Sequence, residues 1–233
     1  MISVIIPVYN QGKKIIDTLE SLVKQSYQDF EIIIVNDASS DNVISKFENF
    51  LKNHQIKQRV LFLNNQKNLG APASRNKGYE SSRGEYILFC DADAVLEPQA
   101  LETMILALDN NSDVDFVYSS FKWGRKLFKL EEFSLERLKQ APFIHTMSML
   151  RREAMPAKGW DENLKKLQDW DFFLTIAEND KKGMFIDKVL FTVKPGGTIS
   201  SWVPSFFYKL FPSLPVVKKY NRAVDIVKKK HNL

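Results

Sequence analysis

Two aspartates separated by one residue follow an apolar run that has the composition of a buried strand. The run covers residues 85–90, and Asp91 and Asp93 come directly after it. Carboxylates are ligands that Mg²⁺ and Mn²⁺ take from proteins, usually one or two of them together with substrate phosphates and water. A cation held there would offset the negative charge of a departing diphosphate. The alternative interpretation is that one or both acids cap the next turn, because an isolated Asp-x-Asp pair is common.

A second group of polar residues follows two earlier strand-like runs. Pro7, Tyr9 and Asn10 lie at the end of the first run, and Asp37 follows the second. A carboxylate at position 37 can accept hydrogen bonds from a ribose hydroxyl or a base N–H. The segment 36–40 also suits an Asx turn, and Asp37 considered alone favours this structural interpretation.

A third acid lies at the start of a predicted helix far along the chain. The helix is expected from about Gln168 to Asn179, which places Asp169 and Asp171 in its first turn. Residues two apart on a helix point about 200° from each other, given 3.6 residues per turn, so these two acids cannot face one site. The helix dipole favours the ionised form of Asp169, and an ionised carboxylate that faces a pocket can act as a general base. Ordinary enrichment of acids at helix N-termini explains the pattern equally well.

The elements that must position these residues alternate along the chain. Buried β-branched runs predict strands, and apolar residues at helical spacing predict helices. Strands are expected at 2–7, 31–35, 59–63, 85–90 and 115–119, and helices at about 13–24, 43–51, 71–82, 98–108 and 168–179. This order predicts an α/β fold whose mostly parallel sheet has helices on both faces. Ligands bind such sheets outside the carboxyl ends of the strands, which is where Asp37, Asp91 and Asp93 lie.

Composition excludes several other classes of protein. The chain has 233 residues, of which 44% are hydrophobic and 26% charged, as in one ordinary globular domain with an appendage. A single cysteine excludes a disulfide framework and a cysteine-based zinc site. No apolar run reaches the roughly 18 residues that span a bilayer, and the N-terminal residues lack the features of a signal peptide. We therefore expect a reducing, cytoplasmic location.

The positive charge is concentrated at the C-terminus. The whole chain carries a formal charge of +5, and residues 200–233 contain seven basic residues and one acid. That segment is therefore +6, which leaves −1 for residues 1–199. A nearly neutral body does not provide the basic face that binds nucleic acid, so no nucleic-acid partner is expected.

Taken together and in this order, several segments resemble the family 2 glycosyltransferases, which have the GT-A fold. The likeness covers about residues 2–195, and the segments that carry it are Val4–Asn10, Glu31–Asp41, Asn68–Ala71, Arg75–Gly78, Gly84–Ile87, Asp91–Asp93, Gly159–Glu162 and Gln168–Asp171. The resemblance implies a Rossmann-like GT-A domain over residues 1–199. Its nucleotide-sugar-binding half would be 1–119 and its acceptor-binding half 120–199, followed by a helical extension over 200–233.

The resemblance also implies roles for individual residues. The donor would be bound by Pro7, Tyr9, Asn10, Asp37, Asn68, Arg75, Asp91, Ala92 and Asp93, the metal Mn²⁺ or Mg²⁺ by Asp93 and Asp91, and the acceptor by Trp160, Asp161, Glu162 and Trp170. Asp169 would be the base that deprotonates the acceptor hydroxyl, in a single displacement that inverts the anomeric carbon. UDP is the commonest nucleotide in this family, so we expect a UDP-sugar donor and a glycan or lipid-linked saccharide acceptor.

The chain departs from the family pattern at three points. Gln168 stands where Glu often precedes the base, and Thr175 stands where many relatives carry Arg, so a charge partner is expected to be missing from this helix. The Gln-x-x-Arg-Trp motif of processive members is absent, which indicates transfer of one sugar per encounter. For Arg75 and Lys77, approach to a phosphate and a solvated position stay equally open. The third ligand on the metal side is not placed by the sequence.

The remaining segments are less specific. Residues 120–167 are expected to shape the acceptor pocket, with Ser119, Trp123, His145, Thr146 and Ser148 as candidates. In residues 200–233, aromatic residues precede the basic cluster, a composition that can anchor a protein on an anionic membrane surface. The alternative, which the sequence favours, is a terminal helix whose aromatic side chains pack on the body and whose lysines are solvated.

Other functional classes stay open at this point. An Asp-x-Asp after a strand can hold the nucleophile of a phosphatase, but that chemistry usually uses the first strand, and here the pair follows the fourth. A transferase that synthesises sugar nucleotides would need a Gly-rich loop with Arg and Lys after the first strand, which is missing. A binding protein that has kept the fold and lost turnover is the third alternative, to which Gln168 and Thr175 lend some support.

Overall fold

The computed structural model describes residues 1–196 and 214–233. The predicted strands and helices of the first half are present: β1 (Ile2–Val8), α1 (Ile15–Val23), β2 (Phe30–Asn36), α2 (Val43–Asn53), β3 (Val60–Asn64), α3 (Ala71–Glu80), β4 (Tyr86–Phe89), α4 (Ala100–Asp109) and the start of β6 (Phe116–Trp123). Strands β1 and β2 are buried along almost their whole length, as expected for a sheet covered on both faces.

The sheet has two parts that differ in strand direction. Among the described residues it contains nine strands in the order β3-β2-β1-β4-β8-β6-β9-β5, with β7 paired to β6. Strands β3, β2, β1 and β4 are mutually parallel, which confirms the expected doubly wound unit. The other part includes β5 (Ala94–Leu96), β7 (Lys126–Phe128), β8 (Met149–Arg151) and β9 (Gly183–Val193).

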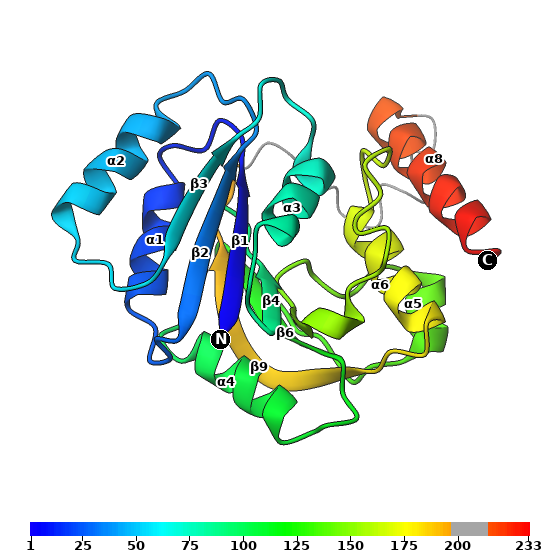
Figure 1. Cartoon of the computed structure of the whole chain (residues 1–233). Coiled ribbons are helices and arrows are strands. Elements are labelled where there is room, and N and C mark those ends of the chain that lie inside the picture. The colour runs from blue at the N-terminus through cyan, green and yellow to red at the C-terminus, as the bar shows by residue number, and fades with distance from the viewer. Residues whose placement is uncertain (197–213) are drawn as a thin grey trace.

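This second part makes the whole sheet mixed and curled. Strand β8 runs antiparallel to both β4 and β6, whereas β9 runs parallel to β6 and antiparallel to β5. Strand β9 is strongly curved and passes beneath the other strands (Figure 1), and it lies between β6 and β5 at one end of the strand order. The prediction of a mostly parallel sheet therefore holds for the N-terminal half, and the long-range antiparallel pairs are added to it.

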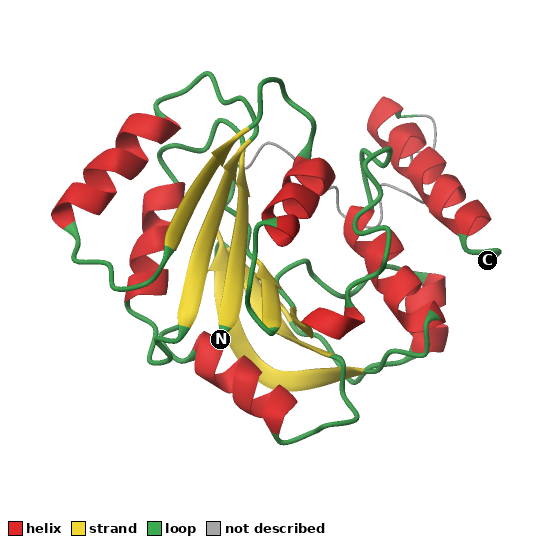
Figure 2. Cartoon of the chain, in the orientation of Figure 1, coloured by secondary structure: helices red, strands yellow, loops and turns green. Residues whose placement is uncertain are grey.

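Helices cover both faces of the sheet (Figure 2). One buried cluster joins the sheet to α1, α2 and α4. The other joins its opposite face to α5 (Leu135–Gln140), α6 (Gln168–Glu178) and the C-terminal helix α8 (Pro215–Lys230). A short 3₁₀ helix, Arg152–Ala154, follows β8. This second cluster is rich in aromatic rings, with Trp160 stacked on Phe172 at 3.9 Å between centroids.

The C-terminal extension is helical, as expected, over Pro215–Lys230. Val217, Ala223 and Val227 form its buried face. The aromatic residues predicted to pack on the body or on a membrane, from Trp202 to Phe211, lie outside the described residues, and so does the predicted boundary at residue 199. Within the described ranges, no helix has the length and apolar character needed to cross a membrane.

Candidate active site

A cleft of about 570 Å³ opens at the carboxyl ends of β1, β2 and β4. Its size falls within the range of about 300–1,000 Å³ that is usual for ligand sites. Ten of the predicted site residues line it: Pro7, Tyr9, Asp37, Asn68, Arg75, Asp91, Ala92, Asp93, Glu162 and Asp169. Three of the acceptor-pocket candidates, Trp123, His145 and Thr146, line it too. Residues from both halves of the chain thus meet around one cavity.

Asp91 and Asp93 occupy the tight turn between β4 and β5. The turn is fixed from two sides, because Thr18 of α1 donates to the Ala92 carbonyl at 3.0 Å and the Lys194 N–H donates to the Asp93 carbonyl at 2.8 Å. Burial and the neighbouring charge of Asp91 raise the pKa of the Asp93 carboxyl, and Lys14 opposes this shift. The Lys14 ammonium lies 3.5 Å from Asp93 Oδ2, so a cation already faces this carboxylate.

Arg75 connects the acid turn to the helix that carries Asp169. Its guanidinium lies 3.3 Å from Asp91 Oδ1 and 3.3 Å from Gln168 Oε1, and it stacks over the Trp160 ring at 4.5 Å. The side chain is 6% exposed. Among the described residues, its Nε has no hydrogen-bond partner. Buried polar groups are nearly always paired in native proteins, so this buried, unpaired N–H is an exception in the wall of the cleft.

Asp37 lines the cleft and also stabilises the fold through hydrogen bonds. Its carboxylate accepts hydrogen bonds from the backbone N–H groups of Leu69 and Gly70, at 2.9 and 2.8 Å, and from Asn65 Nδ2 at 2.8 Å. It therefore holds the start of α3 rather than forming the Asx turn in its own segment. The neighbouring Asn36 instead accepts, through its Oδ1, from the Ser39 N–H three residues farther on at 3.1 Å.

Asn10 does not line the cleft, although its neighbours Pro7 and Tyr9 do. Its backbone has a φ of 52°, in the left-handed region that asparagine tolerates. Its side-chain oxygen accepts from the Ser40 N–H at 2.8 Å. Asn10 thus connects the loop after β1 to the loop after β2, and so fixes the loop that carries Tyr9.

Asp169 faces the cleft from the first turn of α6, and Asp171 points away from it. The geometric expectation that the two acids diverge is met, since Asp171 bonds to Lys230 and His231 on the far side of the helix. Burial raises the pKa of the Asp169 carboxyl, while His145, a backbone N–H and Arg75 oppose the shift. Backbone N–H groups of the first turn favour the ionised form of Asp169, as expected for a helix N-terminus, but desolvation has the larger effect. A raised pKa makes the ionised carboxylate a stronger base.

His145 stands between the acid turn and Asp169. Its Nε2 lies 3.8 Å from Asp91 Oδ2, and its ring lies against Phe121 and Phe191. The Met147 backbone N–H donates to its Nδ1 at 3.1 Å. A neutral imidazole with an accepting Nδ1 carries its proton on Nε2, so this ring presents an N–H toward the cleft. Burial lowers the pKa of His145, which favours that neutral form.

Four predicted acceptor residues divide into two pairs. Trp160 and Trp170 are 2% and 1% exposed and belong to the aromatic core. The Trp160 ring stacks on Phe172, and Trp170 Nε1 donates to the Leu138 carbonyl. Neither indole lines the cleft. Ser119 and Ser148 are likewise buried away from it. The two tryptophans for which the resemblance implied contact with the acceptor therefore belong to the buried core in this structure.

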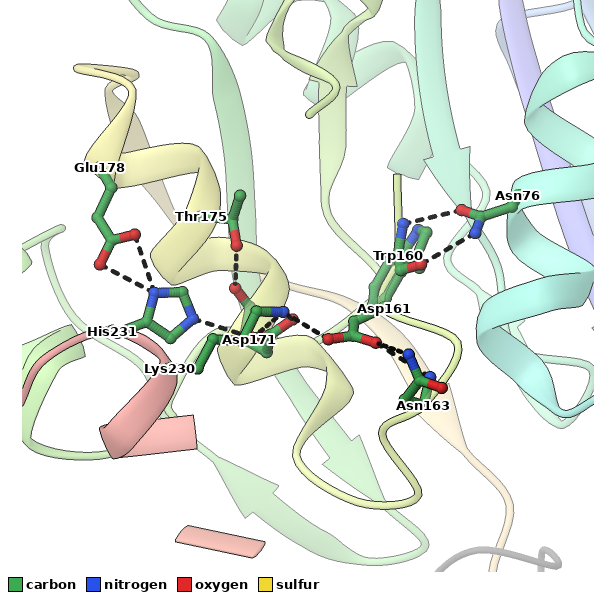
Figure 3. Close-up of polar contacts among 9 residues, drawn as sticks. All are labelled: Asn76, Trp160, Asp161, Asn163, Asp171, Thr175, Glu178, Lys230 and His231. Carbon is green, nitrogen blue, oxygen red and sulfur yellow. Dashed lines mark hydrogen bonds and ion pairs between the residues drawn. The ribbon is translucent and has the colours of Figure 1, made fainter. Parts of the chain in front are cut away.

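The loop around Asp161 and Glu162 is held against α3. Asn76 Oδ1 accepts from the Trp160 N–H at 2.8 Å, and Asn76 Nδ2 donates to Glu162 Oε1 at 2.9 Å. Gly159 begins this loop with a φ of 64°, and a Cβ there would overlap Asn76 Oδ1. The loop presents Glu162 to the cleft, whereas Asp161 turns toward α8 (Figure 3).

The sequence pattern matches a family model over the part of the chain that builds this cleft. The model is that of glycosyl transferase family 2, and it covers residues 3–157. The chain belongs to glycosyl transferase family 2. An uncharacterized glycosyltransferase of Methanocaldococcus jannaschii is 32% identical over 203 residues, which cover 82% of this chain and 69% of that one.

Solved structures share the fold of this glycosyltransferase. Residues 1–349 of TarS from S. aureus, in complex with UDP-GlcNAc, align with a TM-score of 0.73 and 24% identity over 89% of this chain and 63% of that one. The mannosyltransferase PcManGT from Pyrobaculum calidifontis, in complex with GDP-Man and Mn²⁺, aligns with a TM-score of 0.69 and 19% identity over 89% and 59%. This chain thus spans about three fifths of each. The likeness confirms the GT-A fold class.

One residue of this glycosyltransferase site carried no signal in the sequence, and two others stand out there only as departures from the family pattern. Lys14 lies in the loop after β1, where a lysine is ordinarily expected to be solvated. Its ammonium nevertheless contacts Asp93 and the carbonyl of Pro195. Gln168 accepts from Arg75 in the position where a glutamate was expected. At Thr175 the hydroxyl bonds back to the Asp171 carbonyl, and the charge partner of Asp171 comes instead from α8.

Proposed function

We propose that this glycosyltransferase transfers a single sugar from a nucleotide-sugar donor, with UDP as the favoured nucleotide, to a hydroxyl group of a saccharide or lipid-linked saccharide. The observation that carries the proposal is the placement of Asp169 and the Asp91–Asp93 turn on one cleft, linked by Arg75. TarS, whose fold this chain shares, binds UDP-GlcNAc, which supports the choice of a UDP-sugar.

The donor is proposed to lie along the loops after β1, β2 and β4. Tyr9 is 38% exposed at the mouth of the cleft and offers a ring on which a base can stack. Asn68 and Arg75 border the same cavity, and the positive charge of the Arg75 guanidinium can attract the diphosphate. The Nε2–H of His145 points to the same region and can donate to the leaving group as its charge grows.

The acid turn has the donor set that a hard divalent cation requires. Asp91 and Asp93 provide carboxylate oxygens, and the Lys14 ammonium beside Asp93 supports a position for positive charge here. The residues therefore fit Mg²⁺ or Mn²⁺, with further ligands from donor phosphates and water. When bound, the ion offsets negative charge on the departing diphosphate. PcManGT, of the same fold, contains Mn²⁺, which supports this assignment.

The acceptor is proposed to enter opposite the acid turn, beside α6. Asp169 accepts the proton of the attacking hydroxyl, and its raised pKa suits that task. The attack comes from the side opposite the leaving diphosphate, so the configuration at the anomeric carbon inverts. Glu162 lines the same side of the cleft and can accept hydrogen bonds from other hydroxyl groups of the acceptor.

The experiment that tests the proposal is a screen for hydrolysis of nucleotide sugars, with and without Mn²⁺. The wild type should release nucleoside diphosphate from at least one donor, and Asp93→Ala and Asp169→Ala should each remove this activity while far-UV circular dichroism stays unchanged. Asp187→Ala, an exposed acid on β9, is the matched control. Wild-type turnover in either test variant refutes the role of that residue. Binding of nucleotides without any turnover would identify a binding protein instead, and release of phosphate from simple esters would identify a phosphatase.

We further propose that α8 contacts an anionic membrane surface near a lipid-linked acceptor. Lys218, Lys219 and Arg222 are exposed on this helix, and each basic residue near such a surface contributes about 1 kcal/mol. Flotation with phosphatidylserine vesicles at low salt should recover the wild type and leave the triple variant K218E/K219E/R222E in the dense fraction. Equal recovery of both proteins would contradict the proposal, and vesicles of phosphatidylcholine alone are the control.

A further inference from the structure

The end of α8 bonds to the helix that carries Asp169 (Figure 3). Lys230 Nζ lies 2.9 Å from Asp171 Oδ2, and His231 Nε2 lies 2.9 Å from Asp171 Oδ1. The side chains of His231 and Asp171 are only 3% and 4% exposed. A carboxylate with so little contact to water needs compensating charge. Both cationic partners that the structure gives to Asp171 come from a segment about 60 residues farther along the chain.

The geometry of His231 indicates a charged imidazolium. Its Nδ1 lies 2.9 Å from both carboxylate oxygens of Glu178, and its Nε2 faces Asp171. Ionised carboxylates only accept hydrogen bonds, so both ring nitrogens must donate. Burial opposes this charge, but the hydrogen bonds to Asp171 and Glu178 outweigh it and raise the pKa of His231. The ring therefore holds both ends of α6 to α8.

Lys230 makes a second connection, to the loop that presents Glu162. Its Nζ lies 2.7 Å from Asp161 Oδ2. The hydrogen bond from Lys230, together with one from the Asn163 backbone, lowers the pKa of the Asp161 carboxyl against the effect of burial. Since Asn76 holds Trp160 and Glu162 from the α3 side, Lys230 closes a chain of contacts that runs from α3 through the loop to α6.

The position of Asp169 depends on how α6 is rotated about its axis. Asp171 and Asp169 lie on opposite sides of that helix, so a hold on Asp171 fixes the direction of Asp169. A carboxylate sits about 5–6 Å from a helix axis, and a rotation of about 20° would therefore displace it by about 2 Å. A misplacement of about 1 Å at a reacting group can cost about 10²-fold in rate.

We propose that Lys230 and His231 are positioning residues for the acceptor side of the cleft, which act by holding Asp171 on α6 and Asp161 on the loop before it. This inference rests on the proposed function, because it assigns to Asp169 the role of base. It makes the C-terminal helix part of the working site, although no residue of α8 lines the cleft among those described.

The test uses three variants of the full chain. Lys230→Met removes the charge and keeps the length of the side chain, Lys230→Arg keeps the charge, and Lys229→Met removes an exposed lysine from the same helical turn. For the donor whose hydrolysis the wild type shows, Lys230→Met should lower kcat about 10–100-fold. The KM for the donor and the Kd for UDP by calorimetry should stay within about twofold of wild type. Lys230→Arg should restore most of the kcat, and Lys229→Met should match the wild type.

Hydrogen exchange measured by mass spectrometry gives a readout that needs no turnover. In Lys230→Met, amides of residues 159–172 should exchange faster, while those of β1, β2 and β4 should not change. Unchanged exchange in this segment overturns the proposal, even in a protein that hydrolyses no donor. Faster exchange with a wild-type kcat also overturns it, because Lys230 then only attaches α8. A wild type without turnover refutes the proposed function and leaves the exchange result to decide whether Lys230 holds the loop and α6.

Discussion

Asp169 is the residue on which the proposed chemistry depends most directly. It lines the same cleft as the acid turn, and burial raises its pKa. We expect Asp169→Asn to keep the shape of the side chain but lose the base, and kcat should fall about 10²–10⁴-fold. The affinity for UDP should change far less than kcat, because the proposed donor-binding side chains are all kept and Asp169 acts on one of them, Arg75, only through its charge. Product release assayed by chromatography, with UDP binding measured by calorimetry, checks both parts. A loss of UDP affinity equal to the loss of rate would argue against a role in proton transfer.

Gly159 is a second residue whose identity is explained by its surroundings. It has a φ of 64°, and a Cβ there would overlap Asn76 Oδ1. Left-handed backbone costs a residue with a Cβ roughly 1–2 kcal/mol, and relief of the overlap would break a hydrogen bond of the loop. We expect Gly159→Ala to lower the free energy of unfolding by more than Gly196→Ala, whose φ is 84° but whose Cβ, among the described residues, would come no closer than 3.8 Å to another atom. Urea denaturation of both variants makes the comparison, and equal losses would contradict the steric argument.

At the scale of elements, α6 and α8 form a pair whose stability should depend on pH. The group that titrates is His231, which faces the carboxylates of Asp171 and Glu178 on α6. The other charged groups nearby are its neighbour Lys230 on α8 and Asp161 of the loop, which pairs with Lys230. Its pKa is raised in the folded chain, above about 6.5 in the unfolded one. The stabilisation is therefore fully present below about pH 6.5 and is lost as the pH rises through the raised value.

His231→Gln removes this titration. We expect the variant to be less stable than the wild type by roughly 1–3 kcal/mol near pH 6, and the gap should narrow as the pH is raised toward 9. Thermal unfolding of both proteins across this range is the measurement. A gap that does not change with pH would show that the imidazole packs at this position without carrying a charge.

The elements also show which parts of the fold a sequence can predict. Runs such as Ile2–Val8 and Phe30–Asn36 are buried and β-branched, so their strand character is local information. Helix α5 has six residues, too few for a clear period, and β9 has partly exposed residues along most of its length. Their structure depends on partners far away in the chain, which no local pattern encodes.

The candidate site was predictable to a similar extent and for similar reasons. Acids at strand ends face a common cleft because parallel strands end at one edge, so Asp37, Asp91 and Asp93 were accessible to sequence reasoning. Lys14 and Lys230 were not, because they pair with residues far away in the chain. Asp93 lies 79 positions from Lys14, and Asp161 lies 69 positions from Lys230. Trp160 and Trp170 show the opposite case, in which residues next to the site in sequence belong to the core in space.

At the scale of the whole molecule, the proposed donor should stabilise the fold as a ligand of the native state. Binding at a concentration of 100 times Kd adds about 2.7 kcal/mol, which for a chain of this size corresponds to roughly 5–10 °C in Tm. We expect this shift for UDP with Mn²⁺, a smaller one for UDP alone, and no difference between the two conditions in Asp93→Asn. Differential scanning fluorimetry measures all three. A shift in Asp93→Asn that still depends on Mn²⁺ would place the ion elsewhere.

The path of β9 bears on the order in which the molecule assembles. In the donor half, the β1–β2 and β2–β3 pairs join residues 28 positions apart and the β1–β4 pair joins residues 84 apart, whereas Ala94 of β5 pairs with Val193 of β9, 99 positions away. Closing so long a loop carries a larger entropic penalty than closing the short βα connections. We therefore expect a refolding chain to complete its nucleotide half first and to wait for β9 before the half that holds the acceptor exists at all.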